Sequence, residues 1–284
     1  MDIKQTITDK IIHLLETGTQ SSAPRWSGSS RAGIPINAKT GEQYRGINVL
    51  VLWAEMAERS YARSQWLTYN QAAAIGAQVR RGEKSVMCVF YSRVTKVEAA
   101  HDDELEDSYF MAKPFWLFNV EQIDNLPADL TAVPLKNDFN PHAAAEQLLS
   151  DSGAQISYGF DSAYYSPAQD KICLPARERF ASAPLFYATA IHELTHWSGS
   201  ETRLNRQFGS RFGDDAYAFE ELVAELGAAF TVGSLGLIDS TIAAHASYVA
   251  SWIRVLKNDK GAIFTAASAA AKASDFILGG AQVH

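Results

Sequence analysis

The chain has 284 residues, of which 47% are hydrophobic and 20% charged, and its formal net charge is −7. This composition excludes a disordered or collagen-like chain and suffices for one large domain or two of ordinary size. Two cysteines are too few for a disulfide scaffold or a cysteine-ligated zinc site. No apolar stretch reaches the roughly 18 residues of a membrane span, and the mixed charges of the first residues are unlike a secretory signal. We therefore expect a cytoplasmic protein that does not contact a membrane.

The charge is distributed unevenly along the chain. Residues 20–97 carry eleven Lys and Arg against four Asp and Glu, whereas residues 131–284 carry eleven against sixteen. Between them, residues 98–107 hold six acidic side chains. Because electrostatic attraction to nucleic acid acts locally, the basic N-terminal stretch is compatible with a nucleic-acid partner despite the negative total. We expect the two parts of the chain to have different partners.

The N-terminal part mixes predicted helices and strands. Its expected helices are residues 3–18, 49–61 and 71–79, and its expected strands are residues 85–97 and 109–119. The first helix is predicted from isoleucines and leucines at helical spacing, and the third from a capping box formed by Thr68 and Gln71. The two strands are β-branched and aromatic, so they predict a hairpin whose loop is the acidic stretch.

Two prolines and no clear periodicity in residues 125–140 predict a linker. Beyond it we expect helices over residues 141–150, 184–197 and 214–232, strands within residues 156–174, and two alanine-rich helices at the end. The predicted fold class is α+β with two domains. A mixed α/β domain over residues 1–127 is followed by a linker over 128–140 and a mostly helical domain over 141–284.

The most specific motif is H-E-x-x-H, formed by His192, Glu193 and His196 on a predicted helix. Histidines at i and i+4 lie on one helix face, so both imidazoles can bind one Zn²⁺ ion. Glu193 is placed to accept a proton from a water molecule at the metal. The alternative is a structural histidine pair on an amphipathic helix.

A third ligand should come from the next helix. We expect Glu221, 25 residues after His196, to bind the metal, and Glu225, one turn later, to hydrogen-bond a ligand histidine. Glu220 points about 100° away and is the less favoured ligand. The apolar residues between these carboxylates argue against an ordinary solvated acidic face. Three protein ligands leave one coordination position open, which is typical of a catalytic site.

This arrangement resembles the gluzincin class of metallopeptidases, in which a glutamate ligand on a second helix follows H-E-x-x-H. The resemblance implies a zinc peptidase with Glu193 as general base, although Mn²⁺ or another divalent metal is an alternative. It also implies an edge strand that binds a peptide substrate, which residues 171–175 match by position. Tyr217, or His245 with Tyr248, are candidates for stabilising an oxyanion.

Aromatic and basic side chains alternate in the N-terminal part, a pattern that suits single-stranded nucleic acid. From their chemistry we expect Arg45, Arg80, Arg81 and Lys84 to contact phosphates and Trp26 and Tyr44 to stack on bases. The alternative is that the aromatic residues belong to the core and the basic residues to an ordinary surface. Composition alone does not decide between these two interpretations.

A family resemblance covers nearly the whole chain in one domain order. Residues 25–26, 40–48, 66–72, 79–85 and 118–122 resemble the N-terminal domain of ArdC-type antirestriction proteins, and residues 187–189, 192–199 and 220–227 match the same family. Conjugative plasmids carry these proteins, and certain plasmid primases share the N-terminal domain. The resemblance implies a single-stranded DNA-binding domain followed by a metallopeptidase-like domain.

The function implied is protection of incoming plasmid DNA from host restriction endonucleases during conjugation. One alternative is an intracellular zinc metallopeptidase that cleaves a regulatory protein or peptide and uses DNA binding only for localisation. A second is a DNA-shielding protein whose metal site is structural. A primase is disfavoured, because no acidic polymerase motif or helicase motif follows the N-terminal domain.

Overall fold

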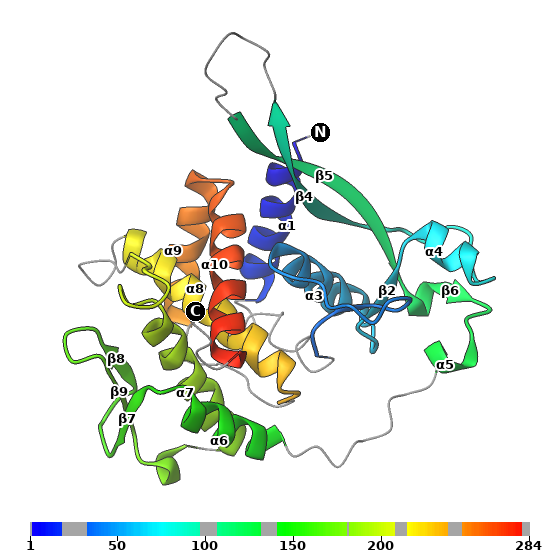
Figure 1. The fold of residues 1–284 in the computed structure, drawn as a ribbon. Helices are drawn as coiled ribbons and strands as arrows, with labels where there is room; N and C mark the ends of the chain where they lie inside the picture. The colour runs from blue at the N-terminus through cyan, green and yellow to red at the C-terminus, as the bar shows by residue number, and fades with distance from the viewer. Residues whose placement is uncertain are drawn as a thin grey trace.

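The fold was analysed in a computed structural model that describes residues 2–18, 33–96, 107–131, 141–180, 182–207, 215–237 and 246–279. Sheets and helices are mixed in the N-terminal half, and the C-terminal half is largely helical (Figure 1). The predicted α+β class is therefore confirmed. No helix in these ranges is long and apolar enough to cross a membrane.

The N-terminal half is built around one long hairpin. Its elements are α1 (Ile3–Gly18), β1 (Ile36–Asn37), α3 (Ile47–Arg59), β2 (Gln65–Leu67), α4 (Tyr69–Ala74), β3 (Gln78–Val79), β4 (Val86–Lys96), β5 (Asp107–Asn119), β6 (Ile123–Asp124) and α5 (Ala128–Thr131). The main sheet has the order β1-β2-β5-β4, and β3 pairs with β6 separately. The antiparallel register runs from Val86 opposite Leu117 to Lys96 opposite Asp107, so the predicted hairpin is confirmed. The predicted acidic loop over 98–107 lies outside the described residues except for Asp107, the first residue of β5.

The third helix is shorter than its predicted range of 71–79. The capping box is present, because the Thr68 hydroxyl accepts from the Gln71 N–H and the Gln71 side chain accepts from the Thr68 N–H. The helix ends at Ala74, and Gly76 then adopts a positive φ of 76°, a conformation that glycine tolerates. Gln78 and Val79 pair with β6 instead of continuing the helix.

The C-terminal half has a small sheet beside a bundle of helices. Its elements are α6 (Pro141–Asp151), β7 (Gln155–Tyr158), β8 (Tyr164–Ser166), β9 (Lys171–Leu174), α7 (Ala183–Ser198), α8 (Asp215–Ser234), α9 (Ala246–Asn258) and α10 (Ala262–Leu278). The order of the sheet is β7-β9-β8, with β9 parallel to β7 and antiparallel to β8. The expectation that residues 171–175 form an edge strand is therefore wrong, because both sides of β9 are paired.

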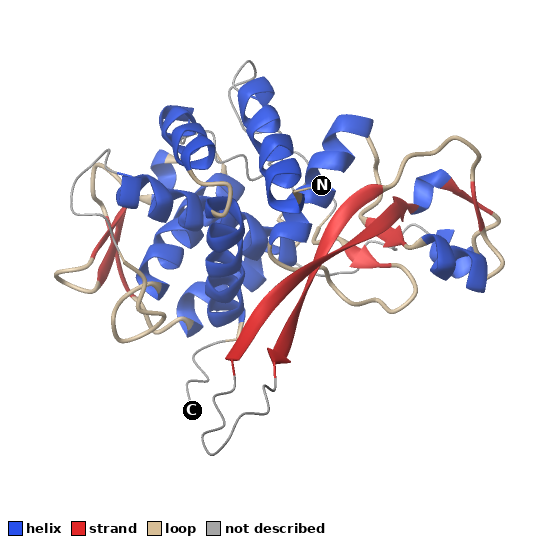
Figure 2. Ribbon diagram, turned by 90° about the horizontal axis from the view of Figure 1, so that it is seen from above, coloured by secondary structure: helices blue, strands red, loops and turns tan. Residues whose placement is uncertain are grey.

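One hydrophobic core joins the two halves. Leu222, Leu226 and Phe230 of α8 belong to the same buried cluster as α1, α3 and the hairpin. The ring of Phe230 lies 5.8 Å from that of Trp53 in α3, and Trp53 is fully buried. Figure 2 shows the β4–β5 hairpin crossing between the helical bundle and the smaller group that contains α4 and the short strands. Helix α8 is thus shared by both predicted domains, and the predicted boundaries stay a prediction.

The closest approach of α7 to α8 occurs at Gly227. A Cβ atom at this position would lie 2.6 Å from Cγ2 of Thr195, whose hydroxyl is bonded to the Ile191 carbonyl at 2.8 Å. Thr195 is fully buried, so its methyl group has no free space to enter. The small residue therefore sets how close the two helices come.

We predict that Gly227→Ala lowers the free energy of unfolding by about 1–3 kcal/mol because of overpacking, although alanine has the higher helix propensity by about 1 kcal/mol. Chemical denaturation of the full chain measures the change. Adding Thr195→Ser removes the clashing methyl group and should recover part of the loss. Stabilisation by Gly227→Ala alone would contradict the packing described.

Candidate metal centre

The two histidines of the H-E-x-x-H motif come from one well-defined helix. Helix α7 begins after Ser182, whose hydroxyl accepts from the Leu185 N–H, and ends at Gly199. His192 and His196 lie one turn apart, with ring centroids separated by 4.8 Å and Nε2 atoms by 3.2 Å. Both side chains are largely buried, so their Nε2 atoms turn toward a common point inside the protein.

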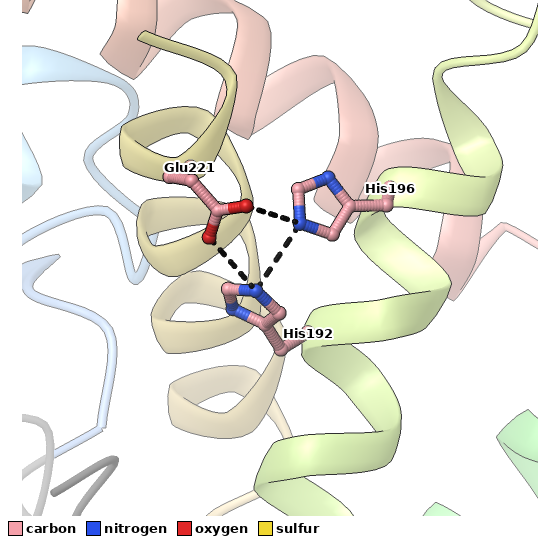
Figure 3. Close-up of side chains that lie close together, drawn as sticks. All are labelled: His192, His196 and Glu221. Atoms are coloured by element: carbon pink, nitrogen blue, oxygen red, sulfur yellow. Dashed lines mark hydrogen bonds and ion pairs between the residues drawn. The ribbon is translucent and has the colours of Figure 1, made fainter. Parts of the chain in front are cut away.

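Helix α8 supplies the third donor. The two carboxylate oxygens of Glu221 lie 3.6 Å from Nε2 of His192 and 3.6 Å from Nε2 of His196 (Figure 3). One donor atom from each of the three residues lies within 4.8 Å of the others. His192, His196 and Glu221 therefore form a buried metal-binding triad of the His-His-Glu type.

The outer nitrogen of each imidazole faces a second carboxylate on α8. Nδ1 of His196 lies 3.2 Å from Glu220, and Nδ1 of His192 lies 3.7 Å from Glu225. Such contacts fix the orientation and tautomer of ligand histidines. Glu225 lies beside a ligand histidine, but 3.7 Å exceeds hydrogen-bond length, so the expected hydrogen bond stays a prediction. Glu220, disfavoured as a ligand, has the matching position beside the other imidazole.

Arg206 connects this outer layer to α7. Its guanidinium donates to both oxygens of Glu220, at 3.1 and 2.8 Å, and to the Thr195 carbonyl at 2.6 Å. It also bonds the hydroxyl of Ser198 at 3.0 Å. The sequence analysis missed Arg206, because it lies in a loop whose spacing from the motif carries no periodic signal. Arg206 holds Glu220 in position against His196.

The electrostatics of this cluster favour a bound cation. Four glutamates, Glu193, Glu220, Glu221 and Glu225, are each at most 7% exposed. Among the described residues, Arg206 and the two histidines form ion pairs with Glu220, Glu221 and Glu225. Buried carboxylates require compensation by positive charge, and two imidazoles with one carboxylate are ordinary ligands of a divalent metal. The residues present therefore fit a divalent metal ion.

The pKa shifts follow the same arrangement. Burial raises the pKa of Glu221, but the adjacent His192 and His196 and the hydroxyl of Tyr217 outweigh it, and the net shift is downward. Burial lowers the pKa of His192, but Glu221 and Glu225 reverse this and shift it upward. Without metal, the extra positive charge that the triad needs is a proton on an imidazole. A metal ion would displace that proton.

Four further candidates from the sequence lie beside the triad or outside the described part. Glu193 is 7% exposed and follows His192 directly within the continuous helix α7, so it lies next to the ligand pair. Tyr217, considered for the oxyanion, lies one turn before Glu221 and hydrogen-bonds its carboxylate. His245 lies outside the described residues, and so does the side chain of Tyr248.

The six side chains predicted to bind DNA have different surroundings in the structure. Trp26 lies outside the described residues. Tyr44 is half-buried and stacks on Phe115, Arg45 forms an ion pair with Asp275, and Arg80 pairs with Glu83 and Asp124. Arg81 and Lys84 are exposed. The role of these six residues in DNA binding stays a prediction.

Comparisons with known proteins agree with both halves of this description. The family model for the N-terminal domain of anti-restriction factor ArdC matches residues 1–118, and the model for a zincin-like metallopeptidase matches residues 143–269. The crystal structure of the antirestriction protein ArdC from plasmid R388 in its metal-free form is 38% identical, with a TM-score of 0.81 over 98% of this chain and 97% of that chain. The chain belongs to the ArdC family of antirestriction proteins.

A second structure and two other known proteins are also similar to this chain. The Mn(II)-bound structure of the R388 protein is 37% identical and covers both chains fully, with a TM-score of 0.81. A protein of Sinorhizobium fredii, y4eC, is 35% identical over 97% of this chain and 91% of its own length. The DNA primase TraC of Escherichia coli is 38% identical over 96% of this chain, which spans only 27% of the primase. The resemblance stated from the sequence motifs is thus confirmed, and a member of the family holds a divalent metal.

We predict that Arg206→Gln weakens metal binding by about ten-fold, because Glu220 loses the cation that holds it against His196. Competition between the full-length protein and a chromophoric chelator for Zn²⁺ measures this affinity. Arg203→Gln is the matched control, since Arg203 lies in the same loop but pairs with Asp170. Equal affinities for the wild type and Arg206→Gln would contradict the role given to Arg206.

Proposed function

We propose that this chain binds single-stranded DNA and protects incoming plasmid DNA from host restriction endonucleases during conjugation, while carrying a zinc site of the metallopeptidase type. The observation that carries the proposal is the full-length similarity to an antirestriction protein of a plasmid. The match to DNA primases over the same region supports DNA as the partner, because a primase acts on DNA. The basic stretch at residues 20–97 supports a polyanionic ligand.

The residues of the metal centre support a hydrolytic mechanism. When bound, Zn²⁺ or another divalent metal polarises a carbonyl and lowers the pKa of water. His192, His196 and Glu221 hold the ion, and Glu220 and Glu225 orient the two imidazoles. Glu193 takes a proton from the attacking water and returns it to the departing amine. A peptide would lie extended beside β8, which pairs only with β9 among the described strands.

A second candidate is a zinc metallopeptidase that cleaves a regulatory protein and uses DNA only for localisation. The complete triad with a buried glutamate next to it favours this reading over a purely structural metal site. Both candidates require the same ligands. They differ in whether proton transfer by Glu193 is needed for protection of DNA.

We expect binding to single-stranded DNA to weaken steeply with salt, with a slope in log–log form of about −0.7 for each phosphate neutralised. Fluorescence anisotropy of a labelled oligonucleotide, titrated with the full-length protein at several salt concentrations, measures the slope. A duplex of the same sequence is the control and should bind less tightly. Binding that is absent, or flat in salt, would contradict the proposal.

Glu193→Gln should retain the metal and DNA binding, because it preserves size and touches no ligand-orienting contact. If protection of plasmid DNA against a restriction endonuclease persists in this variant, coating of the strand suffices. If protection is lost while both binding activities remain, the peptidase interpretation is correct. A Glu221→Gln variant, which alters a ligand, is the control that should lose metal.

A further inference from the structure

Three aromatic side chains lie where β5 meets α4. Trp116 and Phe118 are two residues apart on β5, so their side chains point to the same face of the strand. Tyr69, the first residue of α4, packs edge to face against Phe118 with ring centroids 6.5 Å apart. Tyr69 and Trp116 are each 52% exposed, whereas Phe118 is partly buried beneath them.

The exposure of these rings is not explained by the fold. The opposite face of the same strand places Phe115 and Leu117 against the main core. Trp116 instead lies opposite Met87, and half of its surface remains in contact with solvent. Large aromatic residues exposed side by side mark a binding surface more often than scattered apolar residues do. We call the rings of Tyr69, Trp116 and Phe118 the aromatic stripe.

Two exposed cations lie next to the stripe. Arg81 and Lys84 belong to the connection between β3 and β4, and β4 begins two residues after Lys84, opposite Leu117 of β5. Neither side chain forms an ion pair within the part of the chain that the structure describes. Both are therefore available to an anionic ligand.

The acidic groups nearby are already occupied. Glu83 accepts from Arg80 and Gln122, which lower the pKa of its carboxyl. Glu121 accepts from the backbone N–H groups of Ala62 and Arg63, at 2.7 and 2.8 Å. Arg80 thus pairs with Glu83 and Asp124, whereas Arg81 and Lys84 carry positive charges that no described carboxylate pairs with.

We propose that the aromatic stripe, with Arg81 and Lys84, is the surface on which single-stranded DNA binds. This inference rests on the proposed function and replaces Tyr44, Arg45 and Arg80 as the expected contacts. Single strands bind where bases stack on flat side chains and cations follow the phosphates, which is the combination found here. A duplex, whose bases are already stacked, gains nothing from the exposed rings.

The test compares two exposed aromatic residues of the same hairpin. Phe90, 60% exposed, pairs with Lys113 and points to the opposite face from Trp116, so Phe90→Ala is the matched control. Anisotropy titrations of full-length variants use a labelled oligothymidylate as the probe. Trp116→Ala and Tyr69→Ala should each weaken binding by about ten-fold, and Phe90→Ala should leave it unchanged.

The charges are tested by the salt dependence. Arg81→Ala and Lys84→Ala should each reduce the slope by about 0.7, whereas Lys272→Ala, an exposed lysine of α10, should not change it. If the wild type binds DNA and the stripe and charge variants keep its affinity and salt slope, this surface is overturned but the proposed function is not. Equal weakening by Phe90→Ala would do the same. A wild-type protein that fails to bind would instead overturn the proposed function, and the inference with it.

Discussion

The contact between α7 and α8 determines the rest of this structure. Two imidazoles from one helix and three carboxylates from the other are buried together, and this requires both a cation and a short distance between the helix axes. Gly227 against Thr195 provides the short distance. Arg206 supplies a fixed positive charge to Glu220, and Glu221 faces the position that a divalent metal would occupy.

Helix α8 also explains how the N-terminal and C-terminal halves, which carry different chemistry, share one hydrophobic core. The side of α8 that carries Glu221 faces α7, while Leu226 and Phe230 enter the core shared with α3 and the hairpin. A change that displaces α8 therefore acts on the metal centre and on the N-terminal half together. The aromatic stripe lies where β5 of that hairpin meets α4, so DNA binding and metal binding use surfaces on different elements linked through one core.

The metal ligands could be predicted from the sequence because helical periodicity is local. The spacing of His192 and His196 places them on one face, and Glu221 falls on the next predicted helix. The roles of Glu220 and Arg206 could not be predicted, since they depend on how a loop folds back onto α7. The stacking of Tyr44 on Phe115 could not be predicted either, because no local pattern reveals a neighbour 71 positions away. The central place of β9 likewise depends on pairing with β7 and β8, which the sequence of one strand does not specify.

The central claim is that Glu221, and not Glu220, completes the metal site. Calorimetric titration of Zn²⁺ into the metal-free full-length protein tests it, with Glu221→Gln and Glu220→Gln as paired variants that differ by one position on the same helix. We predict one equivalent bound by the wild type, loss of binding in Glu221→Gln, and retained but weaker binding in Glu220→Gln. Loss of binding in Glu220→Gln with wild-type affinity in Glu221→Gln would contradict the account.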